Sequence, residues 1–161
     1  ALGQLSQISE ALSNTLAAVD DTGTFAGLSL AYDNFNWFVA GEYTVVNIED
    51  SFYPEDINYY ATAGFRSGKW TPYVTYEKTD RNADPKFVDQ IGGFPEPFQV
   101  PLTQLVVGLQ LGAVAESTTL SLGFKYDLDN QIALKADVVR QTNDINEEKS
   151  SLMRFAINYV F

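Results

Sequence analysis

Apolar and polar side chains alternate with a period of two along most of the chain from Thr24 onward. The clearest case is the segment 152–161, in which Met153 and the other odd-numbered residues are apolar or aromatic, whereas Arg154 and Asn158 lie among the even-numbered ones. The segment 119–128 alternates in the same way, with leucines and aromatic residues opposite small or charged ones. This period is that of a β-strand with one apolar and one polar face.

Five further segments follow this rule, which makes seven predicted strands of about ten residues each. The segments are residues 24–33, 37–46, 57–66, 69–78, 119–128, 131–140 and 152–161. Strands of soluble proteins are usually about five or six residues long, whereas a tilted strand that crosses a bilayer needs about ten. The segment length therefore favours an all-β fold, an antiparallel up-and-down transmembrane β-barrel.

The connections between the predicted strands alternate between short and long. Turn-forming residues occupy the short links at 33–36, 67–68 and 129–130, and polar residues fill the long links at 47–56, 80–116 and 142–151. Outer-membrane barrels have short turns at one end of the barrel and long loops at the other. The order of the links therefore supports the same architecture.

Two segments have an apolar spacing closer to that of a helix. Residues 102–115 could form another strand, but one extra crossing would move the turn at 129–130 to the long-loop end. We therefore predict a short helix there, inside the long loop. Residues 1–23 have a similar spacing, so we expect a loop helix over 1–23 and the strands over 24–161, in a single domain of residues 1–161. The alternative is that each segment is a surface helix on a soluble sheet.

Composition excludes several classes of function. The chain contains no Cys and no His, which rules out disulfides, thiolate or imidazole zinc sites, and catalytic triads built on imidazole. Its 10 Lys+Arg and 21 Asp+Glu give a net charge of -11, which does not favour binding to nucleic acid. No apolar run reaches the roughly 18 residues of a membrane-spanning helix. We expect no enzymatic activity, no catalytic residues, no metal site and no cofactor.

The segments Leu122–Asp127, Ala133–Asp137 and Arg154–Phe161, with residues 30–43 and 68–73, carry a family resemblance. They resemble the C-terminal half of Gram-negative porins, and the resemblance covers about residues 24–161. It implies a water-filled barrel, contacts with outer-membrane lipids and a homotrimer. It also implies passive diffusion of small hydrophilic solutes and ions across the outer membrane of a Gram-negative bacterium.

The resemblance implies an assembly signal in the last strand as well. In porins this strand ends in Phe and displays alternating apolar and aromatic side chains, which the barrel-assembly machinery recognises during biogenesis. The residues that match this signal are Phe155, Ile157, Tyr159 and Phe161.

The length of the chain bears on how much of a barrel it can form. A sixteen-stranded porin needs about 260 residues or more, whereas this chain has 161. The predicted strands are also odd in number. We therefore expect the chain to contribute about seven strands of a larger, sixteen-stranded barrel, as its C-terminal portion. The alternative is a complete eight-stranded barrel with one strand that the pattern does not reveal.

If the apolar faces contact lipid, the opposite faces line the pore. The pore-lining residues that this register predicts are polar or charged: Glu42, Tyr60, Arg66, Tyr73, Glu77, Lys125, Asp127, Lys135, Asp137 and Arg154. Mixed charges in a wide, water-filled bore would create a transverse field that tunes ion preference. The alternative is that each charged residue forms an ordinary ion pair and has no role in ion selectivity.

Aromatic residues near the strand ends, among them Trp37 and Trp70, are expected to form girdles at the membrane surface. Passive diffusion is the function that the sequence favours. One alternative is a small, plugged outer-membrane barrel with a structural or interaction role. The other is a soluble carbohydrate-binding β-sandwich.

Overall fold

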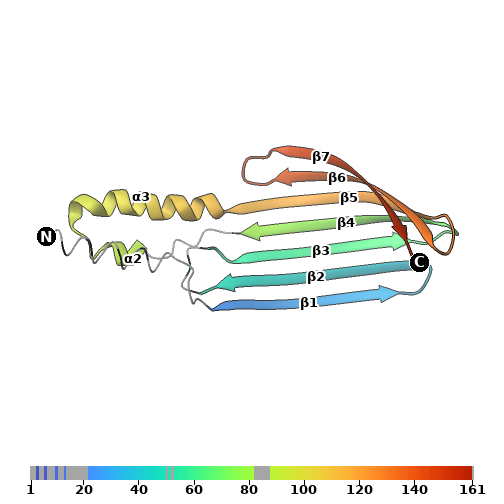
Figure 1. Cartoon of the computed structure of the whole chain (residues 1–161), viewed down its shortest axis with the longest axis horizontal. Helices are drawn as coiled ribbons and strands as arrows, with labels where there is room; N and C mark the ends of the chain where they lie inside the picture. The colour runs from blue at the N-terminus through green and yellow to red at the C-terminus, as the bar shows by residue number, and fades with distance from the viewer. Residues whose placement is uncertain are drawn as a thin grey trace. The chain divides into compact units, whose positions relative to one another are not determined.

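The computed structural model describes residues 22–49, 53–81 and 88–160, together with Ser51 and the single positions Gly3, Ser6, Glu10 and Ser13. Seven strands in the described chain form one antiparallel sheet in the order β1-β2-β3-β4-β5-β6-β7 (Figure 1). The strands are β1 (Gly23–Asp33), β2 (Trp37–Ile48), β3 (Asp56–Phe65), β4 (Trp70–Arg81), β5 (Ala115–Asp127), β6 (Ile132–Asn143) and β7 (Lys149–Tyr159). Two described helices, α2 (Val88–Ile91) and α3 (Glu96–Ala113), lie between β4 and β5 in the sequence.

The all-β prediction and the seven predicted strands are confirmed, and several strands extend beyond their predicted limits. The longest, β5, has 13 residues. The prediction of a long link over 142–151 is wrong, because β6 continues to Asn143 and β7 begins at Lys149. The backbone N–H of Asn143 donates to the Glu148 carbonyl at 2.8 Å, which extends the hairpin and leaves residues 144–148 as its loop.

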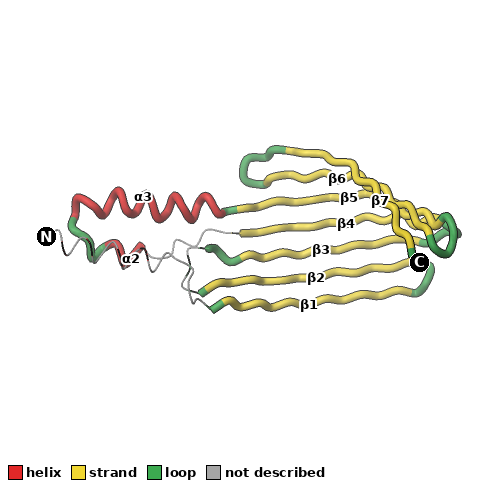
Figure 2. The backbone as a smooth tube through the Cα atoms, viewed as in Figure 1, coloured by secondary structure: helices red, strands yellow, loops and turns green. Residues whose placement is uncertain are grey.

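The three predicted turns lie at one end of the sheet (Figure 2). Local side chains stabilise two of them. In the β1–β2 turn, Phe35 has a φ of 69°, and its N–H donates to the Asp33 carboxylate at 2.8 Å. In the β5–β6 turn, Oδ1 of Asp129 accepts the N–H groups of Gln131 and Ile132, both at 2.8 Å. Such Asx side chains satisfy turn amides that the strand ladder leaves free.

The tight β3–β4 turn uses a glycine instead. Gly68 has a φ of 59°, a conformation that costs glycine little, and the N–H of Trp70 closes the turn on the Ser67 carbonyl at 3.1 Å. The three turns are therefore encoded locally, which is why the sequence predicts them.

The helix predicted inside the long loop is also confirmed, although α3 begins earlier than expected and has 18 residues. No helix in residues 88–113 or elsewhere in the described chain has the length and hydropathy needed to cross a membrane. The apolar residues of the helix predicted over 1–23 lie outside the described residues. Of the described positions within it, Gly3, Ser6, Glu10 and Ser13 have helical backbone, whereas Thr22 is not helical and Gly23 belongs to β1.

By their internal contacts the residues group into two compact units, one of residues 1–26, 45–56 and 81–114, and the other of residues 27–44, 57–80 and 115–161. In the first unit, Ile91, Phe94 and Val106 from α2, α3 and the link between them are buried. The side-chain amide of Gln99 donates to the Phe94 carbonyl at 2.7 Å and fixes this link. The second unit holds most of the sheet.

The sheet is open, with β1 and β7 as its edges. Because consecutive strands alternate in direction and the strands are odd in number, β1 and β7 run the same way. The three buried hydrophobic residues of the described chain, Ile91, Phe94 and Val106, all lie outside the strands. The apolar side chains of the strands are therefore not packed into a protein core.

Candidate pore-lining face

The strand register divides the sheet into two faces. Leu122 pairs with Val138 and Val138 with Met153, and Phe124 pairs with Ala136 and Ala136 with Phe155. These rows define the apolar face. The rows between them place Gly123 opposite Asp137 and Asp137 opposite Arg154, and they define the polar face. Strand alternation puts the two sets on opposite sides of the sheet.

Two rows of aromatic side chains cross the strands on the apolar face. Near the turns, the ring of Trp70 lies 5.4 Å from that of Phe124 and 4.6 Å from that of Tyr126. Farther along the strands, the ring of Tyr59 lies 6.4 Å from those of both Tyr43 and Tyr76. We call these the turn-side and loop-side aromatic bands.

The separation of the two bands is the same on neighbouring strands. The loop-side tyrosines Tyr43, Tyr59 and Tyr76 each have an aromatic residue six positions nearer the turns on the same strand. These residues are Trp37 on β2, Phe65 on β3 and Trp70 on β4, and we include all three in the turn-side band. At a rise of about 3.3 Å per residue this separation is about 20 Å along the strand. The residues between them on this face are apolar or glycine: Val39, Gly41, Ala61, Ala63, Pro72 and Val74.

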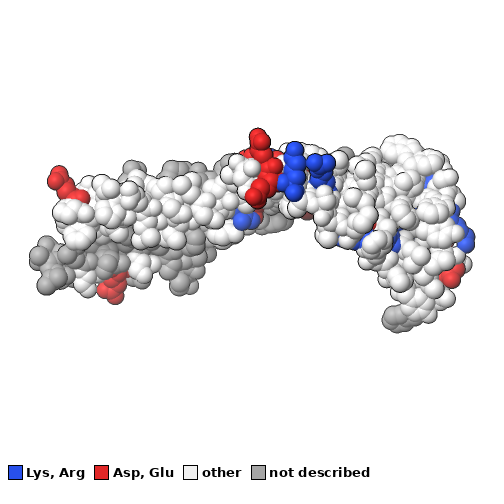
Figure 3. All heavy atoms as spheres, turned by 90° about the horizontal axis from the view of Figure 1, so that it is seen from above, with Lys and Arg blue, Asp and Glu red and all other residues white. Residues whose placement is uncertain are grey.

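The residues predicted to form the assembly signal lie on the apolar face of β7, except Phe161, which falls outside the described residues. The exposed fractions of Phe155, Ile157 and Tyr159 are 78%, 73% and 59%. Their cross-strand partners are Ala136, Leu134 and Ile132. Figure 3 shows one side of the molecule, on which charged side chains gather in a few small groups and most of the described surface is uncharged.

On the polar face, a row of side chains crosses β4 to β7. The Tyr73 hydroxyl on β4 donates to Oδ1 of Asp137 on β6, although β5 lies between these strands. The contact is possible because the intervening residue is Gly123. A Cβ there would lie 2.1 Å from Oδ1 of Asp137 and 2.8 Å from the Tyr73 hydroxyl. Nε of Arg154 on β7 lies 3.7 Å from Oδ2 of Asp137 and completes the row.

The next row toward the turns carries the predicted lysines. Lys125 and Lys135 face each other directly across β5 and β6, an unfavourable pairing of like charges. Nζ of Lys125 lies 2.9 Å from Oδ1 of Asp127, which offsets part of the repulsion. Lys135 has no ion-pair partner in the part of the chain that the structure describes. The structure thus brings together Tyr73, Lys125, Asp127, Lys135, Asp137 and Arg154.

Glu42, Tyr60 and Glu77 form a second group on the polar face, on β2, β3 and β4. They line a hollow of about 200 Å³ together with Thr44, Asn58, Tyr59, Lys78 and Thr79. The hydroxyls of Thr62 and Thr75 are 2.8 Å apart, so the antiparallel alternation brings Tyr60 opposite Glu77. The Thr44 hydroxyl donates to the Asn58 carbonyl at 3.4 Å, which likewise brings Glu42 opposite Tyr60.

Arg66 lies apart from the other predicted pore-lining residues, just beyond the end of β3. Its two terminal nitrogens each lie 2.7 Å from an oxygen of Asp33 on β1. Its guanidinium also lies over the Phe38 ring, 5.0 Å from the ring centre. Arg66 therefore makes an ion pair beside the turns, the alternative that the sequence left open.

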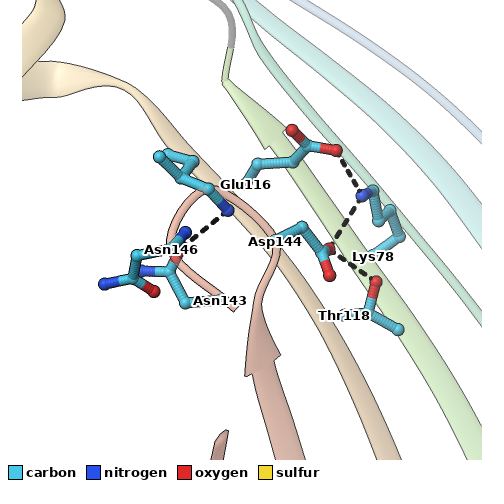
Figure 4. A network of polar contacts seen from close by, with 7 residues as sticks. Lys78, Glu116, Thr118, Asn143, Asp144 and Asn146 are labelled. Atoms are coloured by element: carbon cyan, nitrogen blue, oxygen red, sulfur yellow. Dashed lines mark hydrogen bonds and ion pairs between the residues drawn. The ribbon is translucent and has the colours of Figure 1, made fainter. Parts of the chain in front are cut away.

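The sequence did not predict a charged cluster at the loop end of the apolar face (Figure 4). Nζ of Lys78 donates to Glu116 at 2.7 Å and to Asp144 at 2.9 Å, and the Thr118 hydroxyl donates to Asp144 at 2.7 Å. The hydrogen bonds from Lys78 and Thr118 hold the pKa of the Asp144 carboxyl below its ordinary value. The signal in the sequence is that Lys78 and Glu116 break the apolar alternation at strand ends.

The described residues contain no cluster of three or more acidic side chains suited to holding a metal ion. Comparison of the chain with protein-family models and with curated proteins finds no match.

Proposed function

We propose that this sheet is part of a transmembrane β-barrel in a bacterial outer membrane, and that it forms a pore for small hydrophilic solutes and ions. The observation that carries the proposal is the apolar face, which is exposed and bounded by two aromatic bands about 20 Å apart along the strands. Leu28, Leu122 and Phe155 on this face are 77%, 58% and 78% exposed. Apolar surface of this extent is unfavourable in water and favourable in lipid.

The dimensions of the face support the same proposal. Outer-membrane barrels carry an apolar band about 25 Å tall between two aromatic girdles. On β4, the charged residue Lys78 follows directly after the loop-side band on the same face. The transition from apolar to charged residues therefore falls where lipid would give way to water. A soluble sandwich would need a second layer of protein over these side chains.

The polar face supplies the proposed pore lining. Glu42 and Glu77 lie on β2 and β4, whereas Lys125, Lys135 and Arg154 lie on β5, β6 and β7. The predicted lining of β5 to β7 also contains Asp127 and Asp137, so it has one more basic than acidic side chain, whereas that of β2 and β4 has two acidic ones. In a closed barrel this arrangement would create a field across the bore, which favours charged and polar solutes over apolar ones.

Closure of the barrel requires more than these strands. Because β1 and β7 run in the same direction, they cannot pair with each other in an antiparallel way. In the proposed barrel an odd number of further strands lies between them. Because the strands resemble those of porins, the proposal also includes assembly by the barrel-assembly machinery and a homotrimeric state.

Conductance of the full-length protein in a planar lipid bilayer tests the pore. We expect stepwise increases in current when the folded protein is added to the bilayer. Liposomes that contain the folded protein should also release small hydrophilic solutes trapped inside them. Heat-denatured protein is the control and should give no steps. Folded, bilayer-inserted protein that carries no current and releases no solute would contradict the proposal.

A further inference from the structure

The hollow lined by Glu42, Tyr60 and Glu77 has an unusual combination of side chains. Tyr60 is 38% exposed and lies on the polar face. It belongs to this face because the ring of the preceding residue, Tyr59, is in the loop-side band on the other side of the sheet. A carboxylate lies on the strand at each side of the ring.

Neither carboxylate is neutralised within the described chain. The side-chain carboxylates of Glu42 and Glu77 have no ion pair or hydrogen bond with any residue that the structure describes. Lys78 also lines the hollow, but its ammonium group is paired with Glu116 and Asp144 on the other face. The next basic residue along β4, Arg81, has Nη2 2.6 Å from Asp56. The hollow therefore keeps two negative charges next to an exposed aromatic ring.

Each part of this arrangement favours a particular kind of ligand. Two carboxylates alone would attract any hydrated cation. An aromatic face adds attraction for an organic cation that can lie flat on the ring or present an ammonium group to it. Carboxylates accept charge-assisted hydrogen bonds from guanidinium and ammonium groups. The Thr79 hydroxyl also lines the hollow and offers a further hydrogen bond.

We propose that this hollow is a binding subsite for small solutes that carry a guanidinium or ammonium group. The subsite lies on the lining of the proposed pore, and its role in solute passage rests on the proposed function. A cationic solute there contacts the Tyr60 ring while its N–H groups donate to Glu42 or Glu77. The subsite gives the pore a preference for organic cations over neutral solutes of equal size.

Binding is measured first, on the full-length protein in detergent micelles, by saturation-transfer NMR with argininamide as the probe. Citrullinamide, which replaces the guanidinium with a neutral urea group, is the matched ligand. We expect argininamide to bind and citrullinamide to bind at least about tenfold more weakly, as loss of a charge-assisted contact predicts. Equal signals from the two ligands would overturn the inference.

Four variants assign the site. Glu42→Gln/Glu77→Gln should weaken argininamide binding at least about tenfold, and Tyr60→Leu about threefold to fivefold. Tyr43→Leu, the same change at a tyrosine of the loop-side band that does not line the hollow, should leave binding unchanged. Circular dichroism of each variant verifies folding, and the single change Glu77→Gln is a milder variant that should weaken binding in the same direction. Unaltered binding to the double variant would refute the site.

Conductance of the same preparations separates the two proposals. A conducting pore whose current argininamide does not reduce, and which shows no binding in micelles, would overturn the subsite and leave the pore standing. Binding that depends on Glu42 and Glu77, in a protein that does not conduct, would support the subsite and overturn the pore.

Discussion

Replacing Val138 with arginine should destabilise the membrane-inserted protein by about 2–4 kcal/mol, the cost of a lipid-facing arginine near the bilayer midplane. Val138 lies on the apolar face of β6, between Leu122 and Met153 and within the span of the aromatic bands. Its exposed fraction is 49%. In water, arginine at such an exposed position would change stability by no more than about 0.5 kcal/mol. A large loss therefore identifies lipid as the surrounding medium.

The neighbouring residue provides a matched control. Val139 is the same residue type on the polar face, opposite Ser121 and Leu152. Val139→Arg should cost less than about 1 kcal/mol, because arginine there reaches the water of the pore. Urea titrations of the proteins folded into lipid vesicles, followed by tryptophan fluorescence, give both values. Equal effects of the two substitutions would contradict a lipid-facing apolar face.

Reversing the charges at Lys135 and Arg154 should raise the ratio of cation to anion permeability on the order of tenfold. Both residues lie on the polar face, on β6 and β7. The double variant Lys135→Glu/Arg154→Glu removes two of the three basic side chains of the proposed field and adds to the negative charge of Glu42 and Glu77. Arg154 is 3.7 Å from Asp137 and its side chain is largely exposed, so losing this pair costs little stability.

The reversal potential across a bilayer with a salt gradient measures this ratio. Arg140→Glu/Lys149→Glu is the control, since it changes the charge by the same amount on the same two strands. Arg140 pairs with Leu120 and Lys149 with Thr142, which places both on the opposite face. This control should leave the reversal potential close to that of the unaltered protein. An equal shift from both double variants would argue that Lys135 and Arg154 do not face the conducting path.

The elements of the sheet could be predicted from the sequence because their determinants are local. A period of two defines each strand, and the turns at Asp33 and Asp129 satisfy their own amides through the aspartate side chain. The parity of the links also predicted correctly that residues 102–113 are helical. The extension of β6 to Asn143 was missed, because the polar sequence there resembles a loop although its backbone still pairs.

The arrangement of the polar side chains could be predicted only in part. Alternation correctly assigned Tyr73, Asp137 and Arg154 to one face, but their row depends on the register between strands that are distant in sequence. The space over Gly123 in which Tyr73 contacts Asp137 forms only once β4, β5 and β6 are aligned. The contacts of Lys78 with Glu116 and Asp144 depend on the same long-range register.

The most direct test of the two-faced sheet is a scan of single cysteines along β6, from Leu134 to Val139. The chain contains no native cysteine, so each substitution introduces a unique reporter. Spin labels on the protein in lipid vesicles are compared for collision with oxygen, which concentrates in lipid, and with a water-soluble nickel chelate. We predict alternation at every residue, with oxygen dominant at 134, 136 and 138 and the chelate dominant at 135, 137 and 139. Equal access of the chelate to all six positions would contradict the account.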